Sequence, residues 1–288
     1  MIINDMSHMQ KISQKWYDYI ALPENDWSLT EMALMVAEQV QTEADADLMR
    51  SRQSLEQLKH TLHARVSRVE SVSDKIQIIN DFLFNELGFS ANQDDYFSPE
   101  NSMLDHVIIN RKGIPITLSL IYMELLSIAE IECSGINFPG HFLIGVKVSD
   151  HFHIYDAFRH GVELEKADIR KMLINHHIGI EHDDELADYL QPASNRQIIV
   201  RLLRNLKNIY IELQNAEMSL LVIEMILGLV PFSSDEIRDR GMVYHYLEYT
   251  EGALHDLKSY LDLEPDSHDR EIIEAIIESL MEHTTPLH

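Results

Sequence analysis

The chain of 288 residues carries 48 acidic and 23 basic side chains, which gives a formal net charge of −25 at pH 7. The phosphates of nucleic acids and of anionic lipids repel such a surface, so the charge argues against a nucleic-acid or membrane-surface partner. A hydrophobic fraction of 45% is typical of globular chains, and the length allows one large domain or two ordinary ones.

Three features of the sequence indicate a cytoplasmic protein. The first residues contain no basic segment followed by an apolar run, so no signal peptide is expected. No stretch of about 18 apolar residues predicts a membrane span. The single cysteine, Cys133, cannot form an internal disulfide, so folding does not depend on an oxidising compartment.

Three amphipathic helices are predicted in the first third of the chain. The first begins at Ser28, which is followed three residues later by Glu31, and this spacing is that of a capping box. Apolar residues at helical spacing predict the second helix over about residues 46–66 and the third over about 72–87. Gly88 then ends the third helix as a C-cap glycine.

A loop separates these helices from the centre of the chain. Residues 89–101 are rich in Asn, Asp, Ser and Pro, which favour turns. A short helix is predicted over about residues 102–110, with Asn101 and Ser102 as its capping residues.

The centre of the chain combines one buried helix with an antiparallel sheet. Pro115 in the first turn starts a helix over residues 116–129 that is apolar on most faces, as in a core helix. A helix is predicted again over residues 163–175. Three segments between these helices have the length and residue types of strands: residues 133–137, 141–148 and 151–156.

From Asn195 onward the sequence predicts helices only, and these repeat. Five pairs of identical residues lie 34 residues apart, the period of tetratricopeptide repeats: Tyr210 and Tyr244, Leu220 and Leu254, Leu227 and Leu261, Leu229 and Leu263, and Pro231 and Pro265. Two such units cannot bury their own outer faces, so they are expected to dock onto the first domain. The predicted fold class is therefore α+β, with a helix-rich domain containing a small antiparallel sheet at residues 1–190 and all-α repeats at residues 195–288.

Long motifs in the centre of the chain resemble the SirB1 family. The matching segments are ELGFSANQDDYFSPENSMLDHVIINRKGIPITLSLIY, GINFPGHFLIGV and IYDAFRHG. The resemblance implies a bacterial protein with a papain-like, transglutaminase-like domain followed by tetratricopeptide repeats. Helices before the motifs and the 34-residue period after them fit that layout. In the SirB1-like pattern, residues 96–101 precede the core helix and are expected to pack over the old active-site groove.

The resemblance also implies where catalytic residues would lie. A transglutaminase-like core places a cysteine at the start of a buried helix, where the helix terminus stabilises a thiolate, and adds a His and an Asp from the following strands. The His corresponds to His141 and the Asp to Asp156. The cysteine position is occupied by Pro115, which has no nucleophile. His141 and Asp156 are then a vestigial hydrogen-bonded pair, a ligand- or peptide-binding pair, or an acid–base dyad.

Other residues are weaker candidates for chemistry. Thr117 and Ser119 follow Pro115 and could replace the nucleophile, although hydroxyls in helices commonly bond back to the backbone. Cys133 lies at the far end of the helix and is expected to be a small buried hydrophobe.

Several histidines suggest a metal site: His151, His153 and His160 with His141 and Asp156. No Cys cluster or His-Glu-x-x-His helix accompanies them, and a chain with 16 histidines has adjacent ones by chance. No metal or cofactor is therefore expected.

Two hypotheses about function follow. The first is a non-catalytic interaction or regulatory protein that holds a protein partner, with a homodimer as a further possibility. The second is an unconventional hydrolase or acyl-transfer enzyme that combines His141 and Asp156 with a hydroxyl nucleophile. The missing cysteine favours the first. A hydroxyl within hydrogen-bond distance of His141 would favour the second.

Overall fold

The computed structural model describes residues 11–41, 45–148, 151–180 and 182–284. The chain divides into two units: residues 22–202, here called the α+β unit, and residues 1–21 with 203–288, here called the helical unit. The boundary falls inside helix α9 (Asn195–Glu212). The division at residues 190–195 inferred from the sequence stays a prediction, because a unit of contacts is not by itself a separately folding domain.

The first helices of the α+β unit form where the apolar spacing predicts them. The hydroxyl of Ser28 accepts a hydrogen bond from the backbone N–H of Glu31 at 3.2 Å and caps the first of them. The third helix changes to π-helical geometry after Asn80 and ends before Gly88, whose φ of +74° suits glycine. The bounds are α2 (Leu29–Val40), α3 (Asp45–Val66), α4 (Val72–Asn80) and the π-helical η3 (Asp81–Glu86).

The predicted capping of the next helix is wrong. Residues Pro99–Ser102 form a 3-10 helix, η4, and α5 (Leu104–Asn110) begins after Met103 with no side-chain cap. Asn101 is used elsewhere, because its amide donates to the carbonyls of Asp95 and Tyr96 at 2.5 and 3.1 Å and so orders the preceding loop.

Helix α6 (Pro115–Ile128) lies at the centre of the α+β unit, as its apolar sequence predicts. Pro115 is its first residue, where the missing N–H has no helical partner to lose. Tyr122 is fully buried, and its hydroxyl donates to the amide oxygen of Asn80 on α4 at 2.7 Å. Hydrophobic residues of α2, α3, α4 and α5 complete the core around this helix.

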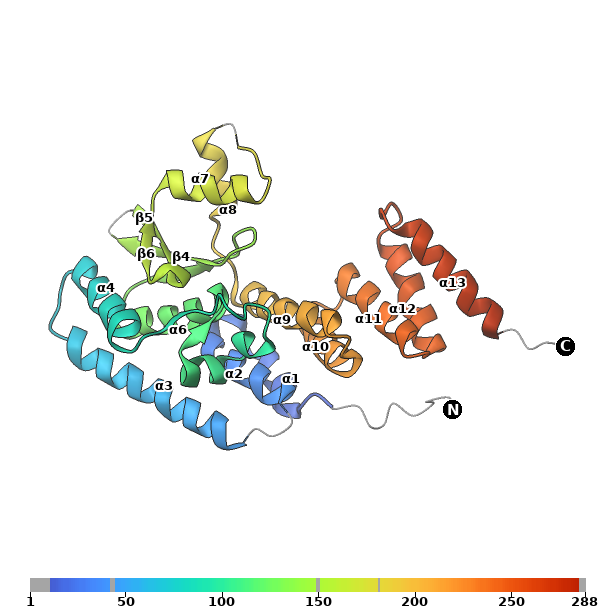
Figure 1. Ribbon diagram of the computed structural model, residues 1–288, viewed down its shortest axis with the longest axis horizontal. Coiled ribbons are helices and arrows are strands. Elements are labelled where there is room, and N and C mark those ends of the chain that lie inside the picture. Colours follow the sequence, from blue (N-terminus) through green and yellow to red (C-terminus); the bar gives the residue numbers. More distant parts are fainter. Residues whose placement is uncertain (1–10, 42–44, 149–150, 181, 285–288) are drawn as a thin grey trace. The chain divides into compact units, whose positions relative to one another are not determined.

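A four-stranded antiparallel sheet covers one side of α6, in the order β3-β4-β5-β6. Successive residues of a strand face opposite sides, so Ile144 contributes to the core around α6, whereas Leu143 packs with residues of α7 and α8. Figure 1 shows the sheet between α6 and α7. The bounds are β3 (Cys133–Ile136), β4 (Leu143–Val148), β5 (His151–Asp156), β6 (Val162–Leu164), α7 (Lys166–Asn175) and α8 (Leu186–Tyr189).

Two details of the sheet differ from the sequence prediction. Residues Val162–Leu164 pair with β5 instead of starting the helix, which begins at Lys166. His141 lies in a bend before β4, because Gly140 adopts a φ of +62° there. A short parallel pair, β1 (Ser90–Ala91) with β2 (Lys112–Gly113), was not predicted and precedes α6.

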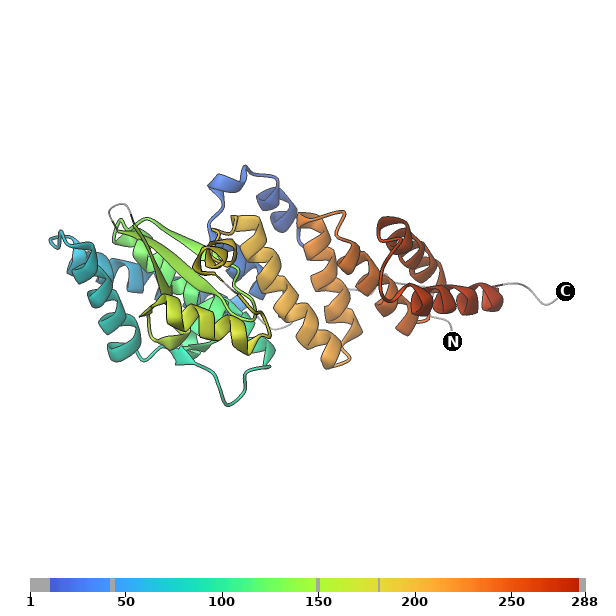
Figure 2. The same cartoon turned by 90° about the horizontal axis from the view of Figure 1, so that it is seen from above.

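The helical unit consists of antiparallel helix pairs, as the repeat predicts (Figure 2). Its helices are α1 (Gln14–Ile20), the second part of α9, α10 (Ala216–Leu229), α11 (Ser234–Tyr246), α12 (Thr250–Leu263) and α13 (Arg270–Thr284). The backbone itself repeats: Gln214 and Glu248, 34 residues apart, both adopt left-handed φ values, of 55° and 59°. Across the residues described, no helix is both long enough and apolar enough to cross a membrane.

Candidate functional site

His141 and Asp156 form a hydrogen-bonded pair at one end of the sheet. The Nε2 atom of His141 lies 3.0 Å from Oδ1 of Asp156. Asp156 is the last residue of β5 and is fully buried, while 14% of the His141 side chain is exposed. Antiparallel pairing of β4 with β5 brings the start of one strand to the end of the other, which explains why residues 15 positions apart meet.

Of the two carboxylate oxygens of Asp156, Oδ1 alone forms hydrogen bonds within the described residues. Its Oδ1 atom also accepts a hydrogen bond from the backbone N–H of Phe158 at 2.9 Å. Its Oδ2 atom is buried and has no hydrogen-bond partner among the described residues. Within the same part of the chain, His141 bonds through Nε2 alone, so Nδ1 keeps its capacity to bind a ligand or carry a proton.

In the described structure, neither candidate hydroxyl is hydrogen-bonded to His141. Thr117 donates to the carbonyl of Asn101 at 2.8 Å and accepts from the backbone N–H of Ile114 at 3.1 Å. Ser119 is fully buried, and its hydroxyl has no hydrogen-bond partner in the described structure. Pro115, buried at the first position of α6, completes a helix start without a nucleophile.

Cys133, the single cysteine of the chain, lies in a strand and not at the start of a helix. It lies in β3, half-buried, with its Sγ atom 3.9 Å from the carbonyl oxygen of Met123. Burial raises the pKa of its thiol to about 11, which keeps the thiol protonated at neutral pH.

The histidines of the sheet do not form a metal centre in the described residues, where no three His, Cys, Asp or Glu side chains are grouped suitably. His153 instead has its Nδ1 atom 2.7 Å from a carboxylate oxygen of Glu163 on β6. His153 on β5 and Glu163 on β6 therefore form a cross-strand pair.

An aromatic wall beside the dyad was not predicted from the sequence. The ring of Phe158 lies edge-on to His141, with centroids 5.7 Å apart, and edge-on to Tyr96, with centroids 6.2 Å apart. Tyr96 belongs to residues 96–101, the segment that the family resemblance implies would pack over the old active-site groove. Phe158 lies two residues after Asp156, so the short motif that contains the acid also supplies this neighbour.

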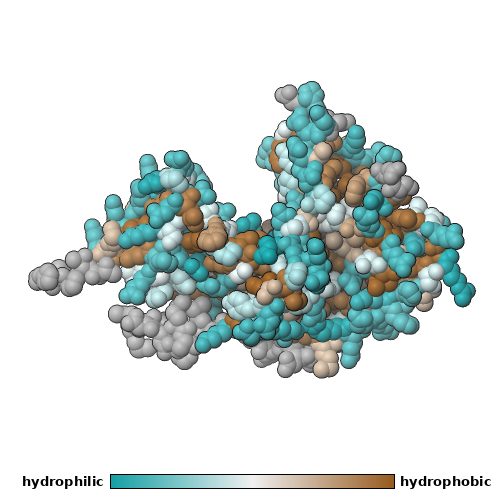
Figure 3. Space-filling model, turned by 180° about the vertical axis from the view of Figure 1, so that it is seen from behind, coloured by the Kyte–Doolittle hydropathy of each residue, from teal (hydrophilic) through white to brown (hydrophobic). Residues whose placement is uncertain are grey.

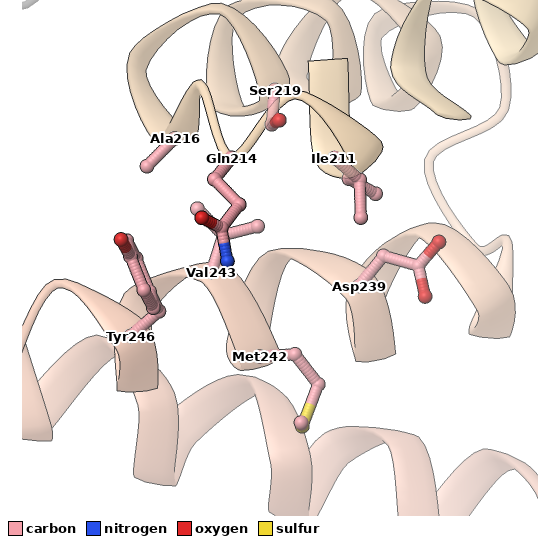
Figure 4. Close-up of a pocket in the computed structure, with 8 residues that line it drawn as sticks. All are labelled: Ile211, Gln214, Ala216, Ser219, Asp239, Met242, Val243 and Tyr246. Carbon is pink, nitrogen blue, oxygen red and sulfur yellow. The ribbon is translucent and has the colours of Figure 1, made fainter. Parts of the chain in front are cut away.

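A second candidate site is a hollow of about 260 Å³ in the helical unit. Figure 4 shows Gln214 reaching from the α9–α10 turn towards α11. Three apolar side chains at its border remain exposed: Tyr246 at 63%, Ile211 at 40% and Met242 at 36%. Its other lining residues are Ala216, Ser219, Asp239 and Val243. Hydrophobic side chains also reach the surface of the repeats in Figure 3, at the left of the view.

Comparisons with known proteins agree with this architecture. The model of the transglutaminase-like superfamily matches residues 49–204, and a tetratricopeptide-repeat model matches residues 206–278. A UPF0162 protein of Xylella fastidiosa (strain Temecula1) is 32% identical over 95% of this chain and 97% of its own. A UPF0162 protein of Vibrio cholerae is 28% identical over 68% of this chain and 72% of its own.

The resemblance inferred from the central motifs is confirmed by a further relative. Protein SirB1 of Salmonella typhimurium is 25% identical over 81% of this chain and 86% of that protein. No solved structure matches the chain significantly. Family models, relatives and the order of the structural elements agree, and the chain belongs to the transglutaminase-like SirB1/UPF0162 family.

Proposed function

We propose that this protein is a non-catalytic interaction protein, in which a transglutaminase-like domain without a nucleophile is joined to partner-binding repeats. The observation that carries this proposal is Pro115 at the first position of α6. A helix start stabilises a thiolate only if a cysteine stands there, and proline offers neither a thiol nor a hydroxyl.

The alternative, a hydrolase or acyl-transfer enzyme with a hydroxyl nucleophile, has less support. His141 and Asp156 are paired at 3.0 Å, as such an enzyme would need. The hydroxyl of Thr117, however, is committed to the carbonyl of Asn101, and Ser119 is fully buried. A general base must reach the proton it removes, and neither hydroxyl is bonded to His141.

The catalytic part of the proposal is tested by turnover. Purified protein is assayed for amine incorporation and for peptide cleavage, with and without a thiol alkylator. We expect no turnover above that of the His141→Ala variant. Alkylator-sensitive turnover that Cys133→Ala abolishes would contradict the proposal. Turnover lost in Thr117→Val or in Ser119→Ala would establish the hydrolase alternative instead.

The hollow of the helical unit is the surface that we assign to the partner. Its exposed Ile211, Met242 and Tyr246 offer apolar contact. Residues 203–288 contain 17 Asp and Glu but six Lys and Arg. Five of these basic side chains are already paired with carboxylates: Arg204, Lys207, Arg238, Arg240 and Arg270. The remaining negative charge fits a partner segment that combines Lys or Arg with an apolar anchor.

Peptide selection tests this surface directly. Random peptides are selected on the full chain, and the affinities of the selected sequences are measured by fluorescence anisotropy. We expect sequences that contain basic and apolar residues, bound at least about tenfold more weakly by the Met242→Glu and Tyr246→Ala variants. Phe232→Ala is the matched control, because Phe232 is 84% exposed and does not line the hollow.

Two outcomes would contradict the assignment. Acidic peptides, or peptides that bind all variants equally, would show that the hollow does not select a basic segment. A second copy of the chain as occupant would appear in sedimentation as a dimer that Met242→Glu dissociates, and this result too would overturn the assignment.

A further inference from the structure

A groove of about 450 Å³ follows helix α3 in the α+β unit and is here called the α3 groove. The residues that α3 contributes to it are spaced three or four positions apart, so they share one face of the helix: Arg50, Ser54, Gln57, Thr61 and Arg65. Residues of η3 and α5 form the other side. Figure 1 shows α3 along the outside of the α+β unit, where such a face can meet a ligand.

The α3 groove is basic, although the chain as a whole is acidic. Three arginines line it, and Glu86 is the one acid among its described lining residues. The Nη1 atom of Arg65 lies 2.7 Å from Oε1 of Glu86, so this pair cancels one positive charge and leaves two. Arg50, Arg65 and Arg111 are all exposed. In a chain of net charge −25, this local excess of positive charge favours an anionic partner.

The positive charges lie at two separate ends of the groove. Arg65 and Arg111 share one end, because Arg65 pairs with Glu86 and Nη1 of Arg111 donates to the carbonyl of the next residue, Leu87, at 2.7 Å. A guanidinium has five N–H donors, so both arginines keep donors for a ligand. Arg50 lies 15 residues before Arg65, which is about 22 Å along the axis of a helix. One small anion is too short to contact both ends.

The rest of the lining is uncharged. Leu58 lies on α3 between the two ends and is half-buried, as are Leu87 and Ile109 on the opposite side. Phe82 and Ile108 are 3% and 4% exposed and contribute further apolar surface. The groove therefore matches an elongated ligand that has an apolar middle and a negative charge near each end.

We propose that the α3 groove binds an extended acidic segment of another protein, with one carboxylate at Arg50 and a second at Arg65 and Arg111. Guanidinium donors match the two oxygens of a carboxylate. An extended chain advances about 3.3 Å per residue, so seven residues span about 20 Å. Alternate side chains face the same way, which directs acids at positions one and seven and apolar residues at positions three and five towards the groove.

This surface differs from the hollow of the helical unit in place and in charge. The hollow is assigned to a basic segment, whereas the α3 groove selects an acidic one. The inference therefore goes beyond the function proposed above and does not depend on it.

Binding is measured by NMR titration of the full chain with the unlabelled, end-capped peptide ESLSLSE. We expect it to shift the amide signals of Ser54, Thr61 and Ile109. The control peptide QSLSLSQ lacks the charges, and ESLSE carries both acids on a chain too short to join the two ends. Both controls should bind at least about tenfold more weakly.

Two variants test the groove itself. Arg50→Glu reverses the charge at one end and should weaken the binding of ESLSLSE at least about tenfold, whereas Arg50→Lys should have a smaller effect because it keeps the charge. Ser54→Glu places a like charge inside the groove and should also weaken binding. Arg68→Glu is the matched control, because Arg68 is exposed, does not line the groove and changes the net charge equally.

Four results would overturn the proposal. In the first, ESLSLSE fails to bind or shifts signals around Met242 and Tyr246 instead. In the second, either control peptide binds as tightly, or millimolar phosphate or acetate displaces ESLSLSE, as expected of a site for small anions. In the third, Arg50→Glu and Ser54→Glu keep full affinity. In the fourth, sedimentation shows a dimer of the free chain that Arg50→Glu dissociates, which would make a second copy the occupant.

Discussion

The hydroxyl of Thr117 donates to the backbone carbonyl of Asn101 at 2.8 Å and so joins α6 to a residue 16 positions earlier. The same oxygen accepts the N–H of Ile114, the residue that precedes the helix. One hydroxyl therefore satisfies two buried backbone groups at the position where a catalytic centre would be. Thr117 thus makes a structural contact at the start of α6.

We expect Thr117→Val to destabilise the α+β unit by about 1–3 kcal/mol, because the carbonyl of Asn101 and the N–H of Ile114 would be left buried without partners. Urea denaturation followed by the fluorescence of Trp27, in a Trp16→Phe background, measures the change. Ser119→Ala is the control: its hydroxyl is buried without a partner in the described chain, so it should cost no more than about 1 kcal/mol. Equal losses in the two variants would refute this account of Thr117.

A double-mutant cycle on His141 and Asp156 should reveal a favourable coupling free energy of about 0.5–3 kcal/mol, since the pair is mostly withdrawn from water. The single variants His141→Ala and Asp156→Ala and the double variant are unfolded in urea. Asp156→Ala should be the costlier single change, because it also removes the acceptor of the Phe158 N–H. A coupling near zero would mean that the pair adds nothing to stability.

Glu236 should make the helical unit sensitive to acid. Burial alone would raise the pKa of its carboxyl, but hydrogen bonds from Arg204 and Ser233 and the charge of Lys207 lower it to about 2. A carboxyl whose pKa is lower in the folded than in the unfolded chain, where it is about 4.3, stabilises the fold above that value. The contribution, of the order of 3 kcal/mol, is lost as the pH falls from about 4.3 to about 2.

Urea denaturation at pH 7 and at pH 3, followed by Trp16 fluorescence in a Trp27→Phe background, checks this dependence. Glu236→Gln should be much less stable at pH 7 and should lose less further stability on acidification. Asp235→Asn is the control, because that side chain is 64% exposed and should leave the acid sensitivity intact. An unchanged pH response in Glu236→Gln would disprove the assignment.

Helix α1 should contribute strongly to the stability of the helical unit. Trp16 is 1% exposed, and its indole lies against the backbone of α10 at Gly228. Trp16→Ala should therefore destabilise the helical unit by about 3–5 kcal/mol, measured by thermal unfolding in circular dichroism. Trp16→Phe should be far milder, since the indole N–H has no partner among the described residues. Tyr17→Ala, at a 42% exposed position, should have little effect.

Much of the fold follows from spacing that is visible in the sequence. Apolar residues at helical spacing locate α2, α3 and α6 to within a few residues, and the 34-residue period anticipates a backbone that repeats at Gln214 and Glu248. These sequence patterns are local or periodic, and the helices that they predict form in the folded chain. The residues of the dyad were located through the family motifs, and no local pattern would have revealed that His141 and Asp156 meet.

What the sequence did not show depends on contacts between distant segments. Strand β6 has three residues, of which Leu164 alone is buried, so it has no alternation to detect. The capping role expected of Asn101 is lost because its amide bonds within the loop.

The half-buried thiol of Cys133 on β3 can report local opening of the sheet through its rate of chemical modification. With a pKa of about 11, roughly one thiol in ten thousand is ionised at pH 7, so modification of the closed state is slow. Any fluctuation that detaches β3 from its neighbours would expose an ordinary thiol and speed the reaction. Because the chain has one cysteine, the labelling rate reports the opening of β3 alone. The rate at which Cys133 is labelled would therefore measure motions of the sheet.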